Sequence, residues 1–189
     1  QSLKPLCRFP TIEDLNMEEN QIVSLVGLES LPRLRKLDLG SNKLTYIIAP
    51  EIITTSSSDD SSSTTGDRNI IGMIKNENIM DQIQKDLDLI QRKDINIFAN
   101  LHFLSQLSLE GNNLKTIYGI SVLTNLLELY LGNNQLTSAR ELDYLKPLKK
   151  LIILDLTGNP LTLPKVYPNY RSYCIHRIRW IKVLDGVPV

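Results

Sequence analysis

Residues 151–161 read LIILDLTGNPL, and this stretch sets the register for the whole chain. Its form is L-x-x-L-x-L-x-x-N-x-L, in which apolar residues alternate with other residues around Leu154. Such alternation is typical of a short strand with one buried face. Asn159 follows where the chain must turn away from that strand, and an asparagine side chain can bond neighbouring backbone groups in such a turn.

The same pattern occurs five times in one register. The other four copies are IEDLNMEENQI at 12–22, LRKLDLGSNKL at 34–44, LSQLSLEGNNL at 104–114 and LLELYLGNNQL at 126–136. Successive asparagines of the pattern are separated by 22, 70, 22 and 25 residues. Five aligned copies predict a repeat protein in which each unit supplies one strand and one return segment.

The segments between the copies also repeat. Apolar residues recur there at every third position, a rhythm that suits one turn of 3₁₀ helix facing the same core as the strand. No unit can bury its apolar face alone, so neighbouring units must stack, and we expect all these residues in the core. They are Leu25, Leu28 and Leu31 after the first asparagine and Ile117, Ile120 and Leu123 after the third.

Length and composition limit the class of protein to which this chain can belong. The 189 residues predict one domain, and 21 basic against 21 acidic residues give no net charge, which argues against a general nucleic-acid or membrane-surface binder. No apolar run reaches the ~18 residues of a membrane-spanning helix. Cys7 and Cys174 lie near opposite ends of the repeats, so we expect them to be unpaired, as in a reducing, intracellular, cytoplasmic compartment.

The first residues of the chain show the three-residue apolar spacing of a return segment. Leu3, Leu6 and Phe9 precede Ile12 at the offsets that Ile117, Ile120 and Leu123 hold before Leu126. No polar end cap precedes them, although a stack of repeats needs one to cover its terminal core. We therefore expect the chain to be part of a longer protein.

A long insertion interrupts the second unit, at about 48–97. Its residues 54–66 are low-complexity and polar, a composition that predicts disorder. Residues 76–92 carry apolar residues at helical spacing and predict an amphipathic helix. This helix either packs on the flank of the repeats or binds a partner. Because the insertion starts after a strand and its turn, it should leave from the convex or lateral side.

Two further helices are predicted. Ser138 and Glu141 form a capping-box pattern before a short helix from Ala139 to about Leu145. Residues 162–189 read as a C-terminal cap, with a helix over about 169–179 and a final strand. The predicted repeats then cover about 12–33, 34–47 continuing at 98–103, 104–125, 126–150 and 151–161.

These motifs resemble the intracellular, 22-residue subclass of leucine-rich repeats, whose members include the regulatory subunit of protein phosphatase one, the spliceosomal snRNP A-prime protein and axonemal dynein light chain one. The family cap reads N-P, Y-R, apolar residues and L-D-G. Here these are Asn159-Pro160, Tyr170-Arg171, Ile175, Ile178 and Leu184-Asp185-Gly186. The chain departs from the family at Arg179-Trp180-Ile181, where Pro-x-Leu is common, and in a long Asn159–Tyr170 spacing.

The resemblance implies an α/β leucine-rich-repeat solenoid: a right-handed arc with a parallel concave sheet, a long insertion and a C-terminal helix-strand cap. It also implies a protein-binding scaffold. The Leu184–Val189 ending and the long interruption resemble ciliary members of the family with several repeat arrays. A cytoskeletal, ciliary or phosphatase-regulatory setting is therefore expected.

Catalytic patterns are scarce. His102 and His176 are not at metal-ligand spacing with each other or with either cysteine, and we expect them to be surface or cap residues. The sequence holds no nucleophile elbow, phosphate loop or zinc-protease motif. We therefore expect no enzyme, no cofactor and no metal.

The concave face, meaning the outward x positions of the strand motif, carries eight carboxylates against two basic groups, Arg35 and Lys36. In a chain of zero net charge, this asymmetry favours a basic partner. The alternative is a merely soluble acidic face. Leu127, Tyr130, Ile152 and Ile153 add an apolar patch that is either an interface or covered by the cap or insertion.

The C-terminal segment is basic, through Arg171, Arg177, Arg179 and Lys182. A solvated helix face explains this, and contact with RNA or an acidic partner is the weaker alternative. We expect Tyr173 and Trp180 in the cap core.

Together these features predict a module that binds a basic or amphipathic peptide or helix on its concave face. A ribonucleoprotein scaffold is the alternative, although RNA binding would need a basic face; nucleic acid and membrane are not expected partners. The candidate partner-binding residues are Glu18, Arg35, Asp38, Ser108, Glu110, Leu127, Glu128, Tyr130, Ile153 and Asp155.

Overall fold

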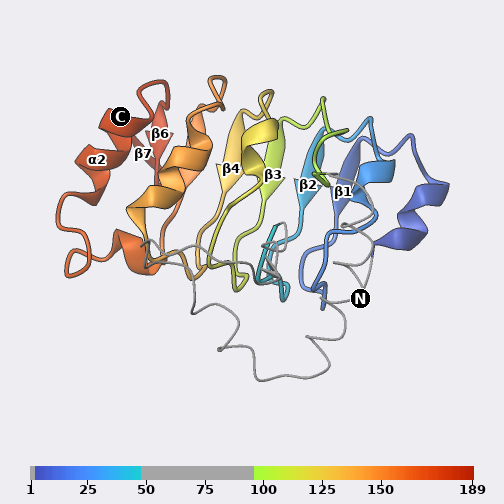
Figure 1. The fold of residues 1–189 in the computed structure, drawn as a ribbon, viewed down its shortest axis with the longest axis horizontal. Coiled ribbons are helices and arrows are strands. Elements are labelled where there is room, and N and C mark those ends of the chain that lie inside the picture. Colours follow the sequence, from blue (N-terminus) through green and yellow to red (C-terminus); the bar gives the residue numbers. More distant parts are fainter. Residues whose placement is uncertain (1–2, 48–95) are drawn as a thin grey trace, which may run out of the picture. The chain divides into compact units, whose positions relative to one another are not determined.

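The computed structural model describes residues 3–47 and 96–189. Within these ranges the strands form one sheet in chain order, each parallel to the next until a final antiparallel pair (Figure 1). The parallel sheet predicted from the repeats is therefore confirmed. The strands are β1 Asp14–Asn16, β2 Lys36–Asp38, β3 Gln106–Ser108, β4 Glu128–Tyr130, β5 Ile153–Asp155, β6 Val183–Leu184 and β7 Val187–Pro188.

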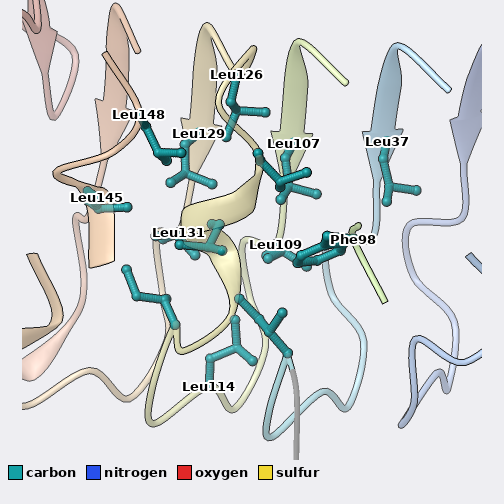
Figure 2. Packing of buried hydrophobic residues seen from close by; sticks show 14 of the residues in the cluster. Leu37, Phe98, Leu107, Leu109, Leu114, Leu126, Leu129, Leu131, Leu145 and Leu148 are labelled. Atoms are coloured by element: carbon teal, nitrogen blue, oxygen red, sulfur yellow. The ribbon is translucent and has the colours of Figure 1, made fainter. Parts of the chain in front are cut away.

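The middle leucine of each repeat strand points into the core. Leu37, Leu107 and Leu129 are direct partners across neighbouring strands, and each is at most 1% exposed. Figure 2 shows them at one level, with Phe98 packed among the leucines beneath. Strand β2 pairs with β3 although 70 residues separate the asparagines of their repeats, so the register continues across the insertion.

The return segments form short helices behind the sheet. Most are 3₁₀ helices, as the three-residue rhythm predicts, and Gly27 and Gly119 precede two of them with positive φ angles of 116° and 95°. A side chain would be strained at such angles. The described helices are η1 Lys4–Arg8, η2 Leu28–Ser30, η4 Ile120–Val122, η5 Ala139–Leu145, η6 Pro160–Thr162 and α2 Tyr170–Arg177.

Helix η5 spans Ala139–Leu145 as predicted, but its cap differs from the predicted capping box. Ser138 Oγ accepts from the Arg140 N–H, but Glu141 does not reach back to complete a capping box. Its carboxylate instead accepts from Thr116 Oγ1 at 2.9 Å and from the Ile117 N–H at 2.8 Å, in the preceding repeat. The capping-box interpretation is therefore wrong because Glu141 ties two repeats together.

The described chain reaches the predicted insertion at Ile47 and leaves it at Asn96. Ile47 and Phe98 are 3% and 1% exposed, so both ends are anchored in the core. The predicted low-complexity segment at 54–66 and helix at 76–92 lie outside the described residues.

A ladder of buried asparagines joins the repeats edge to edge. Asn134 is 5% exposed; its Oδ1 accepts from the Leu114 N–H at 3.0 Å, and its Nδ2 donates to the Leu109 carbonyl at 2.9 Å, both in the preceding repeat. The same Nδ2 donates to the Leu131 and Gly132 carbonyls of its own turn. The equivalent asparagines bond in the same way and are Asn42, Asn112 and Asn159.

The cap motif is explained by its contacts. Arg171 on α2 donates to the carbonyls of Leu184, Val187 and Pro188, which fixes the β6–β7 hairpin. Asp185 Oδ1 accepts from the Leu156 N–H at 2.8 Å, continuing onto the cap the bonding that the asparagines provide between repeats. Burial raises the pKa of Asp185. The helix–strand cap expected from the family resemblance is present.

The structure also shows where the N-terminal apolar residues, the aromatic residues of the cap and the two cysteines lie. Leu3 is buried, whereas Phe9, at the offset that the buried Leu123 holds in its repeat, is 57% exposed; no strand of the described residues lies beyond β1 to cover it. Tyr173 and Trp180 are half-buried against the core. Cys7 and Cys174 are both free thiols. Among the described residues, no helix is long and apolar enough to cross a membrane.

The ladder predicts a large cost for Asn134→Ala. The substitution leaves the buried Leu114 N–H without a partner and removes the bond to the Leu109 carbonyl, so we expect a loss of about 3 kcal/mol in the free energy of unfolding. Urea denaturation measures it. The matched control is Asn113→Ala, an exposed asparagine next to the ladder residue Asn112, which should change stability by less than about 0.5 kcal/mol. Equal effects would contradict the ladder.

Two glycines test the turns of this fold: Gly158 precedes the ladder residue Asn159, and Gly186 lies in the turn between β6 and β7. Gly158 and Gly186 have φ of 70° and 73°, so Ala at either position adopts the same strained backbone. A Cβ at Gly158 would also overlap Asn133 Oδ1, whereas one at Gly186 meets no atom within 4 Å. We expect Gly186→Ala to cost about 1 kcal/mol and Gly158→Ala at least about 1 kcal/mol more, measured by thermal unfolding. Similar costs would show that the turn yields to the extra methyl.

Candidate partner-binding face

The concave face is built from rows of side chains that cross the strands. The residue before each middle leucine forms row one, the residue after it forms row two, and the register aligns each row from strand to strand. Row one is Asp14, Lys36, Gln106, Glu128 and Ile153; row two is Asn16, Asp38, Ser108, Tyr130 and Asp155.

Tyr130 and Glu128 form the centre of this face. The Tyr130 hydroxyl donates to Glu128 Oε2 at 2.9 Å, which links row two to row one, and Asp155 is the neighbour of Tyr130 on β5. Partial burial raises the pKa of Tyr130, and the hydrogen bond and charge of Glu128 and the charge of Asp155 raise it further. The bond fixes the ring, so the face presents a half-exposed aromatic group of low conformational freedom.

Short polar residues of row two also hold the strand ends. Asp38 Oδ1 accepts from the Gly40 N–H at 2.9 Å, and Asp155 Oδ1 accepts from the N–H and hydroxyl of Thr157. Each bond occupies one carboxylate oxygen. The sequence reading of Asp38 and Asp155 as pure partner contacts missed this local role, which a short side chain two residues before a turn amide could have indicated.

A third row continues beyond the strand ends, where backbone bonds still join neighbouring repeats. It contains Glu18, Gly40, Glu110, Gly132 and Thr157. Glu110 accepts from Asn133 Nδ2 at 3.1 Å, and a Cβ on Gly132 would lie 3.4 Å from Glu110 Oε1. The glycines therefore leave the acidic side chains room above the backbone.

At the β1 side, the strand starts carry a mixed cluster. Arg35 pairs with Glu13 at 3.1 Å, both side chains being 56% exposed, and its guanidinium lies 5.7 Å from the centre of the exposed Phe103 ring. An exposed pair of this kind adds little stability. Arg35, predicted as a partner contact, is thus already engaged, while Ser108 and Asp38 line a shallow hollow over β1–β3.

The predicted apolar patch lies at the β4–β5 side. Leu127 and Ile152 are 38% and 42% exposed, and Tyr130 and Ile153 are half-buried. The C-terminal cap therefore does not cover the patch. An open apolar patch beside carboxylates is the surface that an amphipathic segment fits.

The basic C-terminal residues divide into two pairs. Arg171 donates to the hairpin carbonyls, and Arg177 bonds Asp143 of η5 at 2.8 Å through Nε, which lowers the pKa of that aspartate. These two arginines hold the cap together. Arg179 and Lys182 remain exposed.

The two histidines lie on different elements, His102 before β3 and His176 on α2. His102 is exposed, and its backbone carbonyl accepts from Asn125; His176 is exposed on α2. In the parts of the chain that the structure describes, no three metal-ligating side chains come together.

The comparisons with known proteins agree with this geometry. The sequence model described as "Leucine-rich repeat" matches residues 68–188, more than half of the chain, and that described as "Leucine Rich Repeat" matches residues 33–54. The chain therefore belongs to the leucine-rich repeat family, whose members are in general protein–protein interaction modules rather than enzymes.

Relatives of this chain carry names from different settings. Cilia- and flagella-associated protein 410 of Homo sapiens is 39% identical over 96 residues, 51% of this chain and 37% of that protein. Protein phosphatase 1 regulatory subunit SDS22 of Schizosaccharomyces pombe is 45% identical over 62 residues, 31% of this chain and 19% of that protein. The matches thus span well under two thirds of either relative.

A solved structure shows the same fold. A chain in the crystal structure of the Drosophila melanogaster SNF/U2A' complex superposes with a TM-score of 0.63 at 18% sequence identity, covering 100% of this chain and 86% of that chain. At this identity the likeness concerns the fold.

The Tyr130–Glu128 bond can be tested without a partner. In Glu128→Gln, the carboxylate charge that raises the pKa of Tyr130 is gone, so the phenol should ionise at lower pH than in the wild type. NMR titration of ¹³Cζ-labelled tyrosine follows this group. The control is Glu110→Gln, because Glu110 bonds Asn133 instead, and it should leave the Tyr130 pKa unchanged. Identical titrations in wild type and Glu128→Gln would rule the bond out.

Proposed function

We propose that the concave face binds a basic or amphipathic protein segment, such as a helix. The observation that carries this proposal is the cluster at its centre, where the Tyr130 hydroxyl donates to Glu128 and Asp155 is the neighbour of Tyr130 on β5. A rigid aromatic group among acids suits a helix that offers apolar residues flanked by lysine or arginine. The third-row carboxylates of Glu18 and Glu110 extend the acidic surface.

The spacing of the rows supports a helix or extended peptide that crosses several repeats. Neighbouring parallel strands lie ~4.8 Å apart, so a partner helix of a few turns spans β3 to β5. Leu127 and Ile153 then offer apolar contacts, with Asp155 alongside. The adjoining exposed side chains of Leu127 and Ile152 favour an interface over a face whose only role is solubility.

The proposed setting is an intracellular scaffold, ciliary, cytoskeletal or phosphatase-regulatory. Its support is the likeness to a cilia- and flagella-associated protein and to a phosphatase 1 regulatory subunit. Two free thiols, one of them exposed, suit a reducing compartment. The ribonucleoprotein alternative is weaker, because an RNA backbone would meet the acidic second and third rows.

The test uses a synthetic amphipathic helical peptide of lysine and leucine, with binding measured by surface plasmon resonance. Tyr130→Ala should weaken binding by about 1–2 kcal/mol, as expected for an aromatic anchor. Glu128→Lys should mainly slow association, and more so at low salt. Partners captured from ciliated-cell lysate are then measured on the same variants.

The matched control is Tyr118→Ala. Tyr118 is 51% exposed like a surface anchor but precedes η4, in a return segment behind the sheet, where its ring packs edge-on against Tyr144. Its loss should leave binding unchanged, with circular dichroism confirming the fold of each variant. Unchanged affinity in both Tyr130→Ala and Glu128→Lys would remove the site from the concave face.

A further inference from the structure

A second charged surface lies where the last strands begin. Lys149 and Lys150 precede β5, and Arg179 and Lys182 precede β6; all four are exposed. They come from adjacent elements, because the Lys182 N–H donates to the Ile152 carbonyl at 2.8 Å. The Lys149 ammonium also lies 3.8 Å from the centre of the Trp180 ring. We call these four residues the basic rim.

Within residues 3–47 and 96–189, no carboxylate forms an ion pair with the basic rim. The carboxylate of Glu13 pairs with Arg35, and that of Asp143 pairs with Lys146 and Arg177, so these ion pairs leave the four rim residues out. Lys150 Nζ donates at 2.6 Å to the neutral Asn125 side chain, so its positive charge persists. Four uncompensated cations in one place repel one another and attract an anionic partner.

Apolar side chains adjoin these cations. The Ile152 N–H donates to the Leu127 carbonyl at 2.7 Å, so Leu127, Ile152 and Lys182 follow one another in a line across β4, β5 and β6. The first two are 38% and 42% exposed. The line therefore passes from an open apolar strip into open positive charge.

We propose that the basic rim, together with Leu127 and Ile152, binds an acidic amphipathic protein segment. Aliphatic side chains of the segment pack on Leu127 and Ile152 while its carboxylates face Lys150 and Lys182. This goes beyond the proposed function, which concerns a basic segment on the acidic rows.

A nucleic acid fits this surface less well than a protein segment. Unpaired bases bind by stacking on exposed aromatic rings. The Trp180 ring, which lies beside the rim, is half-buried and already carries the Lys149 ammonium on one side. Leu127 and Ile152 offer aliphatic rather than aromatic contact, which favours leucine-like side chains.

The test is fluorescence anisotropy with a labelled amphipathic peptide of glutamate and leucine. Its affinity should fall as salt is added, and the double variant Lys150→Glu/Lys182→Glu should weaken binding by about tenfold or more. Ile152→Ser should also weaken it, because the apolar strip is interrupted. Lys115→Glu reverses an exposed lysine in the turn before η4 and should leave the affinity within about twofold, as expected for a distant charge.

Two further probes keep the outcomes distinct. The lysine–leucine peptide should bind the double variant at least as well as it binds the wild type. If the double variant binds neither peptide, its fold is damaged. Circular dichroism detects that damage, and the milder Lys150→Gln/Lys182→Gln variant then repeats the test. An oligouridylate of equal charge should bind more weakly than the acidic peptide. Absence of acidic-peptide binding, binding insensitive to the double variant, or tighter oligouridylate binding would each overturn the proposal.

Discussion

The buried asparagine amide is the constraint on which the rest of the structure depends. A repeat that turns sharply after its strand leaves backbone N–H and C=O groups inside the core, where an unpaired polar group costs about 1–3 kcal/mol. Asn112 and Asn134 each satisfy groups in two successive repeats at once. Because one side chain serves both repeats, their relative position is fixed, and strands three residues long can form an ordered sheet.

Fixed stacking is also what makes a surface out of scattered residues. Tyr130 and Asp155 are 25 residues apart, yet the register makes them neighbours, as it does Asp38 and Ser108. The same register carries across the insertion, since the Leu44 N–H donates to Asn112 Oδ1 at 3.0 Å. The leucines and asparagines below a row therefore maintain the spacing of its side chains.

Periodicity predicted the sheet, the core and the short return helices. These follow from burial, and the spacing of apolar residues shows which positions must be buried. It misassigned Glu141, because a pattern of helix starts does not reveal a carboxylate bonding the neighbouring repeat. It also treated every outward acid alike, although Asp38 and Asp155 cap their own turns. The rows of the concave face could be written from the sequence, but the Tyr130–Glu128 bond depends on side-chain geometry that no spacing encodes.

The distribution of charge along the strands has a consequence for binding. Carboxylates of the second and third rows lie at the strand ends, as Glu110 and Asp155 do. Lys150 and Lys182, which form no ion pair with the described part of the chain, lie at the strand starts. A net charge of zero conceals this separation. If both proposals hold, a partner of either sign meets attraction at one edge and repulsion at the other, so charge orients it before contact, and the apolar strip of Leu127 and Ile152 at the strand starts contacts either partner.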